Sequence, residues 1–412
     1  MISRLFCWEV NSMKNPNPYT PGAGFMPAYL AGREKMLQDA EKYLEAIEKG
    51  YPQQSVVYFG LRGVGKTVLL NAIEEIADNK NILYEHIEIK ERKNQRSEQG
   101  YFEQQIANVC KKFLHAMSIR ESAKSLLKRA VGVLKGFTVT YNPAEGTFSA
   151  GVEAEDITEY VGTGDLPSDT TDLFVALGKA ANESGSTVCF FIDEIQYMKE
   201  IEIEALVGAI HRCNQLRLPI MVFGAGLPKI LKTMGDAKSY TERLFRFEEV
   251  DALKREEAEY AVTAPAADWN VVYSQDALDT IITVTGKYPY FIQAFCSTIW
   301  DQCDDDTITK EDVDKALPIF WSNMDKGFFM VRFERCTKRE KQFMYAMVKC
   351  GDLPCTISNV AEIMQTNVNK ISTIRAQLIN KGLIYATGHA EIDFTVPQFD
   401  GFLKRINPEL EL

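Results

Sequence analysis

The fold is decided by Ser55-Val-Val-Tyr-Phe-Gly60-Leu-Arg-Gly-Val-Gly65-Lys66-Thr67-Val-Leu-Leu70. An apolar run, a glycine-rich turn and a helical pattern follow one another, and the turn fits G-x-x-x-x-G-K-[ST] at every position. The glycines let successive backbone N–H groups turn inward around a phosphate, where the positive end of the helix dipole also points. A chance glycine-rich turn is the alternative, but it would not need the flanking strand and helix patterns. The stretch therefore predicts a nucleotide-phosphate site.

Two side chains of this stretch extend the prediction to ATP or ADP with Mg²⁺. We expect Lys66 to reach the β- and γ-phosphates as a point charge. The Thr67 hydroxyl is expected to ligate Mg²⁺. The expected nucleotide contacts along the loop are Gly60, Arg62, Gly63, Val64, Gly65, Lys66, Thr67 and Val68.

Length and composition predict a globular protein of two or three domains. The chain has 412 residues and no apolar segment long enough to span a bilayer. Its nine cysteines are scattered without a C-x-x-C pair, which argues against a zinc site or a disulfide framework and favours the cytoplasm. The net charge of −11 excludes nonspecific coating of nucleic acid, so any DNA contact must be local. The residues before Met13 are expected to be an extension or to reflect an alternative start, so translation begins at Met1 or at Met13.

Two carboxylates end a second apolar run, Ser186-Thr-Val-Cys-Phe-Phe-Ile192-Asp193-Glu194. A run without a polar face is typical of a central parallel strand, because helices cover both its faces. Ligands in such sheets collect at the carboxyl ends of the strands. We therefore expect Asp193 and Glu194 beside the bound phosphates, although an ordinary solvated strand end would have the same residues.

The rest of the chain predicts an α/β fold with additional domains. A hairpin is expected over 137–152, inserted in the first domain, and from Val250 to Asp325 the strands stop and helices take over. Helices over 338–349, 358–364 and 369–381, followed by a hairpin over 383–396 with its tip at Gly388, predict a winged helix-turn-helix. The expected divisions are a leader (1–24), a nucleotide-binding core (25–250), a helical lid (251–330) and the winged helix (331–412).

With the glycine-rich loop and Asp193-Glu194 in place, the chain resembles the AAA+ division of P-loop ATPases. More narrowly, it is similar to the bacterial and archaeal ATPases related to origin-recognition initiators, with an affinity to STAND-type switch ATPases. Outside the loop, the resemblance is carried by Asn17-Pro-Tyr-Thr-Pro-Gly-Ala-Gly24, Leu30-Ala-Gly-Arg-Glu34, Gly286-Lys-Tyr-Pro289-Tyr-Phe-Ile-Gln293 and Ile392-Asp-Phe-Thr-Val-Pro397-Gln-Phe-Asp400. It covers nearly the whole chain except the predicted hairpin insertion, and it implies an AAA+ core, a lid and a C-terminal winged helix.

The resemblance also implies roles for single residues. Asp193 would hold Mg²⁺, mostly through water, and Glu194 would orient and polarise the water that attacks the γ-phosphate. Arg243 or Arg246 would be an arginine finger acting on the nucleotide of a neighbouring subunit, although either could instead be a surface residue paired with a nearby glutamate.

The adenine end of the nucleotide is assigned in the same way. The segment that contains Arg33 would lie close to the adenine, and Pro289 would pack beside it. The alternatives are a charge pair of Arg33 with Glu34 at a helix start and a plain helix-entry proline.

Two departures from the family pattern point to slow hydrolysis. The strand that ends Val222-Phe-Gly224-Ala-Gly226 lacks the Asn or Thr that usually senses the γ-phosphate. The lid motif has Lys287 where an arginine is usual. Slow turnover, or a switch held by nucleotide, is therefore compatible with the sequence.

The predicted winged helix raises the question of double-stranded DNA. Residues 331–412 carry eleven Lys and Arg against nine Asp and Glu, so this part is mildly basic in an acidic chain. The side chains expected to face DNA are Asn369, Lys370, Thr373 and Gln377. Glu391 and Asp393 on the wing would repel phosphates, which leaves docking of a protein partner as the alternative.

Three functions fit these expectations to different degrees. The first is an ATPase that couples ATP binding and hydrolysis to DNA engagement. The second is a nucleotide-gated switch that assembles with a protein partner or as a homo-oligomer. A one-domain transcription factor is disfavoured, because it would leave most of the chain without a role.

Overall fold

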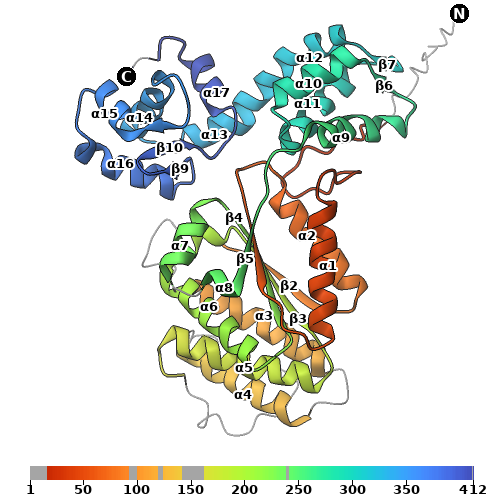
Figure 1. The fold of residues 1–412 in the computed structure, drawn as a ribbon, viewed down its shortest axis with the longest axis vertical. Coiled ribbons are helices and arrows are strands. Elements are labelled where there is room, and N and C mark those ends of the chain that lie inside the picture. Colours follow the sequence, from red (N-terminus) through yellow and green to blue (C-terminus); the bar gives the residue numbers. More distant parts are fainter. Residues whose placement is uncertain (1–15, 92–99, 119–123, 142–161, 238–240, 411) are drawn as a thin grey trace, which may run out of the picture. The chain divides into compact units, whose positions relative to one another are not determined.

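The computed structural model describes residues 16–91, 100–118, 124–141, 162–237, 241–410 and 412. The chain forms two compact units (Figure 1). One unit consists of Met1–Gly32 and Ala252–Arg335, and the other of Arg33–Asp251 and Cys336–Leu412. No helix of the described ranges is both long enough and apolar enough to cross a membrane.

A five-stranded parallel sheet forms the centre of the larger unit. Its strands lie in the order β2-β3-β4-β1-β5. They are β1 (Ser55–Phe59), β2 (Leu83–Glu88), β3 (Val188–Asp193), β4 (Ile220–Gly226) and β5 (Phe245–Glu249). Every residue of β3 and β4 is buried, as continuous apolar strands require in a sheet covered on both faces. The expected parallel sheet is therefore confirmed.

Helices cover both faces of this sheet (Figure 1). They are α1 (Glu34–Glu48), α2 (Lys66–Asn79), α3 (Tyr101–Ser118), α4 (Lys124–Tyr141), α5 (Leu166–Glu183) and α6 (Glu200–Gln215). Two short helices, α7 (Lys229–Ala237) and α8 (Thr241–Leu244), precede β5. Apolar side chains of α3, α4, α5 and α6 form one core with the inward residues of the strands, among them Phe190 and Val222.

The strand expected over 137–141 is wrong, because these residues are the last turn of helix α4. Their β-branched and aromatic side chains favour a strand locally. However, Ala130, Leu134 and Phe137 recur at helical spacing and are all buried in the core, so tertiary packing decides the conformation. Thr138 fits the helix because its hydroxyl donates to the Leu134 carbonyl oxygen at 2.8 Å. The remainder of the expected hairpin, 142–152, lies outside the described residues.

The smaller unit is mostly helical. It contains α9 (Arg255–Ala267), α10 (Gln275–Thr285), α11 (Pro289–Gln302), α12 (Lys310–Asn323), the π-helix η4 (Met324–Phe329) and α13 (Met330–Phe333). The expectation that strands stop after Val250 is wrong in one detail, since β6 (Val272–Tyr273) pairs with β7 (Thr307–Ile308). The leader packs on these helices, where the Tyr19 hydroxyl donates to the Val262 carbonyl oxygen at 2.6 Å.

The C-terminal segment, Cys336–Leu412, belongs to the larger unit. Its helices are α14 (Lys338–Lys349), α15 (Ile357–Ile363), α16 (Val368–Asn380) and α17 (Phe399–Ile406). Its strands β8 (Cys355–Thr356), β9 (Ile384–Gly388) and β10 (Glu391–Phe394) form an antiparallel sheet in the order β8-β10-β9. Side chains of Thr337, Thr356 and Asn367 cap the first three helices, which explains where these helices begin.

Candidate functional site

The glycine-rich loop joins β1 to α2 and has the backbone shape that its sequence predicts. Gly63 and Gly65 have φ angles of 84° and 89°, which residues other than glycine rarely adopt. A Cβ atom on Gly60 would lie 2.0 Å from the Val250 carbonyl oxygen, so this position has no room for a side chain. The loop therefore leads into the N-terminus of α2 as an anion-binding concavity.

Lys66, the first residue of α2, folds back on the loop. Its ammonium group donates to the carbonyl oxygens of Gly60 and Leu61 at 2.9 and 2.8 Å. Desolvation lowers the pKa of Lys66 to about 8, although the carboxylates of Glu194 and Asp193 oppose this shift. The ammonium group therefore lies against the loop, where it donates to uncharged carbonyl oxygens.

The next residue, Thr67, meets the carboxyl end of β3. Its hydroxyl donates to Asp193 Oδ2 at 2.6 Å, and Asp193 Oδ1 accepts from the Glu194 backbone N–H at 2.7 Å. Asp193 is buried. Two hard oxygen ligands side by side, next to a phosphate cradle, are the donor set that Mg²⁺ prefers, so these residues fit the ion.

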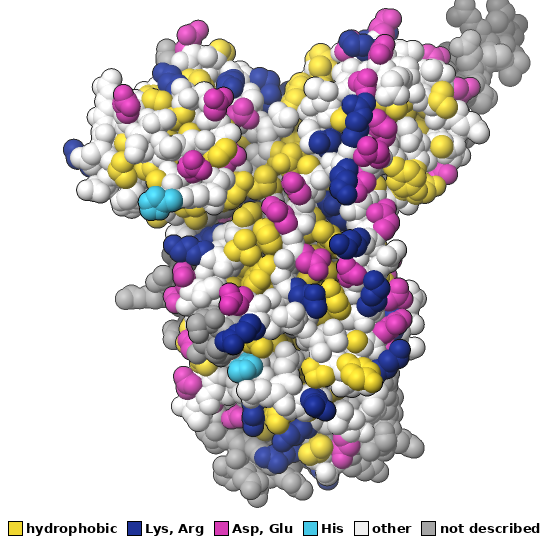
Figure 2. Space-filling model, in the orientation of Figure 1, with side chains coloured by type: hydrophobic (Ala, Val, Ile, Leu, Met, Phe, Trp, Pro, Cys, Tyr) yellow, Lys and Arg dark blue, Asp and Glu magenta, His cyan; other side chains and the backbone are white. Residues whose placement is uncertain are grey.

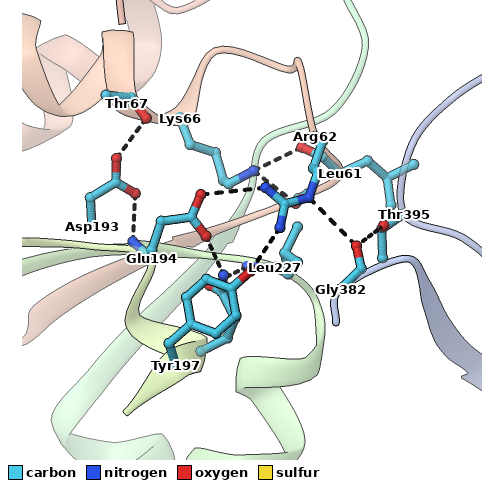
Figure 3. A network of polar contacts seen from close by, with 12 residues as sticks. Leu61, Arg62, Lys66, Thr67, Asp193, Glu194, Tyr197, Leu227, Gly382 and Thr395 are labelled. Atoms are coloured by element: carbon cyan, nitrogen blue, oxygen red, sulfur yellow. Dashed lines mark hydrogen bonds and ion pairs between the residues drawn. The ribbon is translucent and has the colours of Figure 1, made fainter. Parts of the chain in front are cut away.

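Glu194 turns its carboxylate toward the loop (Figure 3). The residue follows β3 directly and has a left-handed backbone, with φ of 53°. Its Oε1 lies 3.6 Å from Nη1 of Arg62, and its Oε2 accepts a short hydrogen bond from Gln196 Nε2. Both oxygens of the carboxylate are therefore engaged.

Gln196 is a site residue that the sequence analysis missed. Its side chain is buried, and its Oε1 accepts from the Leu227 backbone N–H at 2.9 Å. A Cβ atom on Gly226 would lie 2.7 Å from that oxygen, which explains why β4 ends in a glycine. Gln196 thus supplies a polar group between the end of β4 and Glu194. The only sequence signal was a glutamine two residues after the carboxylate pair.

Arg33 forms hydrogen bonds both to the loop and to the chain just after β5. The side chain is buried, and its Nη2 donates to the carbonyl oxygens of Val64 and Asp251 at 2.9 and 2.7 Å. Pro289 lies in the smaller unit, where it is the first residue of α11. The contact of either residue with adenine stays a prediction.

Both candidates for the arginine finger are exposed, but their surroundings differ. The Arg246 guanidinium lies over the Tyr43 ring, 5.0 Å from its centroid. Arg243 lies in the short helix α8, and its backbone carbonyl accepts from the Gln54 side chain at 2.8 Å.

The residues expected to face DNA lie together on α16. All of them are exposed: Asn369, Lys370, Thr373 and Gln377. Ile371 and Leu378, on the other face of α16, are buried. On strand β10, Glu391 and Asp393 are half-buried rather than exposed, and burial raises the pKa of Asp393. The repulsion of phosphates by this strand stays a prediction.

Comparison with known proteins agrees with this geometry. Residues 29–223 match the AAA ATPase domain. Residues 326–403 match a domain of unknown function, DUF8462. The chain matches no curated protein. The AAA ATPase match and the parallel five-stranded sheet flanked by helices together support an AAA+ ATPase.

One solved structure supports the fold, and two others show weaker likeness. The Walker-type ATPase PABY2304 of Pyrococcus abyssi is 13% identical with a TM-score of 0.59, over 91% of this chain and 96% of that one. The Aeropyrum pernix ORC1 protein in complex with DNA is 13% identical with a TM-score of 0.45, over 93% and 94%. The Thermotoga maritima RuvB Holliday junction branch migration motor is 16% identical with a TM-score of 0.42, over 88% and 92%. Only the first likeness is close enough to bear on the fold, and none bears on function.

Proposed function

We propose that the chain is an ATPase that couples ATP binding and hydrolysis to engagement of double-stranded DNA through a C-terminal winged helix. The observation that carries the ATPase part is the convergence of Lys66, Thr67, Asp193 and Glu194 at one edge of the sheet. These groups come from two strand ends that are separated in sequence by more than a hundred residues.

Each side chain has one task in the proposed reaction. The loop N–H groups and Lys66 bind the phosphates, while Thr67 and Asp193 hold Mg²⁺. The ion would neutralise charge on the phosphate oxygens. Glu194 accepts a hydrogen bond from the attacking water and orients it toward the γ-phosphate.

The DNA part of the proposal is supported by the shape and surface of the C-terminal segment. Helices α14 to α16, followed by the β9-β10 hairpin, have the order of a winged helix-turn-helix. The exposed polar side chains of α16 suit contacts with phosphates and base edges. On the face drawn in Figure 2, basic side chains lie among acidic ones, so the proposed contact is local rather than spread over the surface.

Purified protein is expected to hydrolyse ATP faster when duplex DNA is added at moderate salt. Lys370→Ala should weaken duplex binding several-fold and lower the slope of log affinity against log salt by about one, because one phosphate contact is lost. Lys404→Ala is the matched control. Lys404 is an exposed lysine of the same segment, and its Nζ atom lies 3.7 Å from Oδ2 of Asp400 on α17. Absence of both binding and stimulation across a salt series rules out the DNA part.

A second candidate function is a slow switch whose winged helix docks a protein partner. It is favoured by two observations at the site. Strand β4 ends without an Asn or Thr side chain, and both oxygens of Glu194 are engaged by Arg62 and Gln196. This alternative gains if ATP binds tightly while DNA changes nothing.

The arginine finger is proposed to be Arg243, acting between subunits. Arg246 already packs on Tyr43 of its own chain, whereas α8 presents Arg243 at the surface. Arg243→Ala should lower turnover by roughly 10³-fold, and Arg246→Ala much less. Mixing Arg243→Ala with Glu194→Gln should restore activity, because a mixed assembly places an intact arginine beside an intact glutamate. A larger loss in Arg246→Ala, or no recovery on mixing, contradicts the assignment.

A further inference from the structure

Arg62, in the middle of the glycine-rich loop, is bonded to the C-terminal segment. Its backbone N–H donates to the Thr395 carbonyl oxygen at 3.0 Å, and its Nε donates to the Gly382 carbonyl oxygen at 3.5 Å. The same guanidinium donates to the Tyr197 hydroxyl at 2.9 Å and pairs with Glu194 (Figure 3). One side chain therefore joins the C-terminal segment to the carboxylate assigned to water activation.

The C-terminal side of this contact is built for close approach. Gly382, which follows α16, has φ of 62° and is buried. A Cβ atom there would lie 3.0 Å from Nη2 of Arg62 and 3.0 Å from a methyl group of Leu227. The Thr395 side chain, also buried, fixes the Gly382 carbonyl by donating to it at 2.5 Å.

A second contact lies beside the first. Lys229 Nζ, at the start of α7, donates to Asn380 Oδ1 at the end of α16, at 3.0 Å. The residual cavity between the two sides holds about 10 Å³, which is at the lower limit for one water molecule. The two surfaces are therefore in direct contact around Arg62.

We propose that the C-terminal segment restrains ATP hydrolysis by docking on Arg62, which acts as a positioning residue for Glu194. In the docked state Arg62 and Gln196 occupy both oxygens of the Glu194 carboxylate, so the carboxylate is held by these two side chains rather than by a water molecule. Undocking removes two acceptors of Arg62, so its guanidinium is no longer fixed against Glu194. The Oε1 atom of Glu194 is then free to orient water, while Oε2 keeps its hydrogen bond from Gln196. The inference rests on the proposed ATPase function.

The same contact links docking to nucleotide. The Arg62 backbone N–H belongs to the loop that must close around phosphate. In the docked state, however, this N–H donates to the Thr395 carbonyl oxygen. If nucleotide and the C-terminal segment compete for the loop, the two effects are reciprocal. ATP weakens docking by some factor, and undocking must tighten ATP binding by the same factor.

Two variants open the contact by substitutions at residues that are not themselves expected to bind nucleotide. Asn380→Ala removes the acceptor of Lys229, and Gly382→Ala pushes a methyl group against Arg62 and Leu227. Gly351→Ala is the matched control for the second, because Gly351 has φ of 93° and nothing within 4 Å of its Cβ position. Both glycine variants therefore bear the same kind of backbone cost, but only one disturbs the contact.

Hydrogen exchange and turnover are measured on the full chain. Without nucleotide, peptides that cover 379–385 and 395 should exchange faster in Asn380→Ala and Gly382→Ala than in wild type and Gly351→Ala. The kcat for ATP should rise about fivefold in Asn380→Ala, which is the effect of losing one hydrogen bond of ordinary strength, and it should also rise in Gly382→Ala, where the added methyl group forces the two sides apart.

The outcomes separate the docking from the reaction. Unchanged exchange in both variants overturns the docked contact. Faster exchange with kcat unchanged or lowered overturns the restraint on Glu194. If the wild type and all variants fail to bind ATP, the proposed function has failed and this inference falls with it, even where exchange shows the segment docked.

Discussion

Glu194→Gln is expected to bind ATP as the wild type does and to lose hydrolysis by a factor of about 10² to 10⁴, the usual contribution of a general base. The replacement keeps the size of the side chain and an oxygen that can accept from Gln196. It removes the negative charge and the ability to accept a proton from water. Nucleotide binding is measured by calorimetry, and turnover by release of inorganic phosphate.

Glu88→Gln is the matched control for this experiment. Glu88 ends β2 and pairs in register with Asp193, so its carboxylate lies at the same edge of the sheet. Glu88 is exposed, and no role in catalysis is assigned to it. Wild-type turnover in Glu194→Gln, or an equal loss in Glu88→Gln, would show that the water-orienting residue is assigned wrongly.

Lys66→Ala is expected to weaken ATP binding by about 100-fold or more, because it removes a charge-assisted hydrogen bond to phosphate. Among the described residues, the ammonium donates to the uncharged carbonyl oxygens of Gly60 and Leu61, and desolvation lowers its pKa. Titration with a fluorescent ATP analogue measures the change. Lys80→Ala, just beyond the far end of α2, should leave affinity unaltered, since Lys80 pairs with Glu45 there.

The lowered pKa of Lys66 also predicts how the affinity for ATP depends on pH. Desolvation lowers the pKa of Lys66 to about 8, and bound phosphates would favour its charged form. Binding above pH 8 therefore takes up a proton, and the wild-type affinity should fall as the pH rises from 7 to 9. Lys66→Arg, which stays charged, should show no such fall. An unaltered affinity in Lys66→Ala contradicts the role given to this residue.

The strand, loop and helix of the candidate phosphate site could be predicted from sequence because their determinants are local. The strand, the glycines that need positive φ and the helix start lie within sixteen residues, so one pattern specifies them all. Asp193 and Glu194 could be placed as well, because the carboxyl ends of parallel strands meet at one edge. In the region of 137–141, however, local propensity pointed to a strand, whereas burial against α3 and α5 required a helix.

The contacts of Arg62 and Gln196 could not be predicted, because they depend on distant parts of the chain. The partner of Arg62 at Gly382 is 320 residues away in sequence. Gln196 acts through the backbone of Leu227, and a backbone partner leaves no pattern in the side chains. Only the fold brings these groups together.

The Arg33 side chain has a consequence for how the chain is assembled. Arg33 is the first residue of the larger unit, and Asp251 is the last before the chain passes to the smaller one. The hydrogen bond of 2.7 Å between them brings the entry and exit of the sheet-bearing part together. Compact parts of a protein whose two ends lie close together are those that tolerate domain insertion and circular permutation, and Arg33–Asp251 has this arrangement.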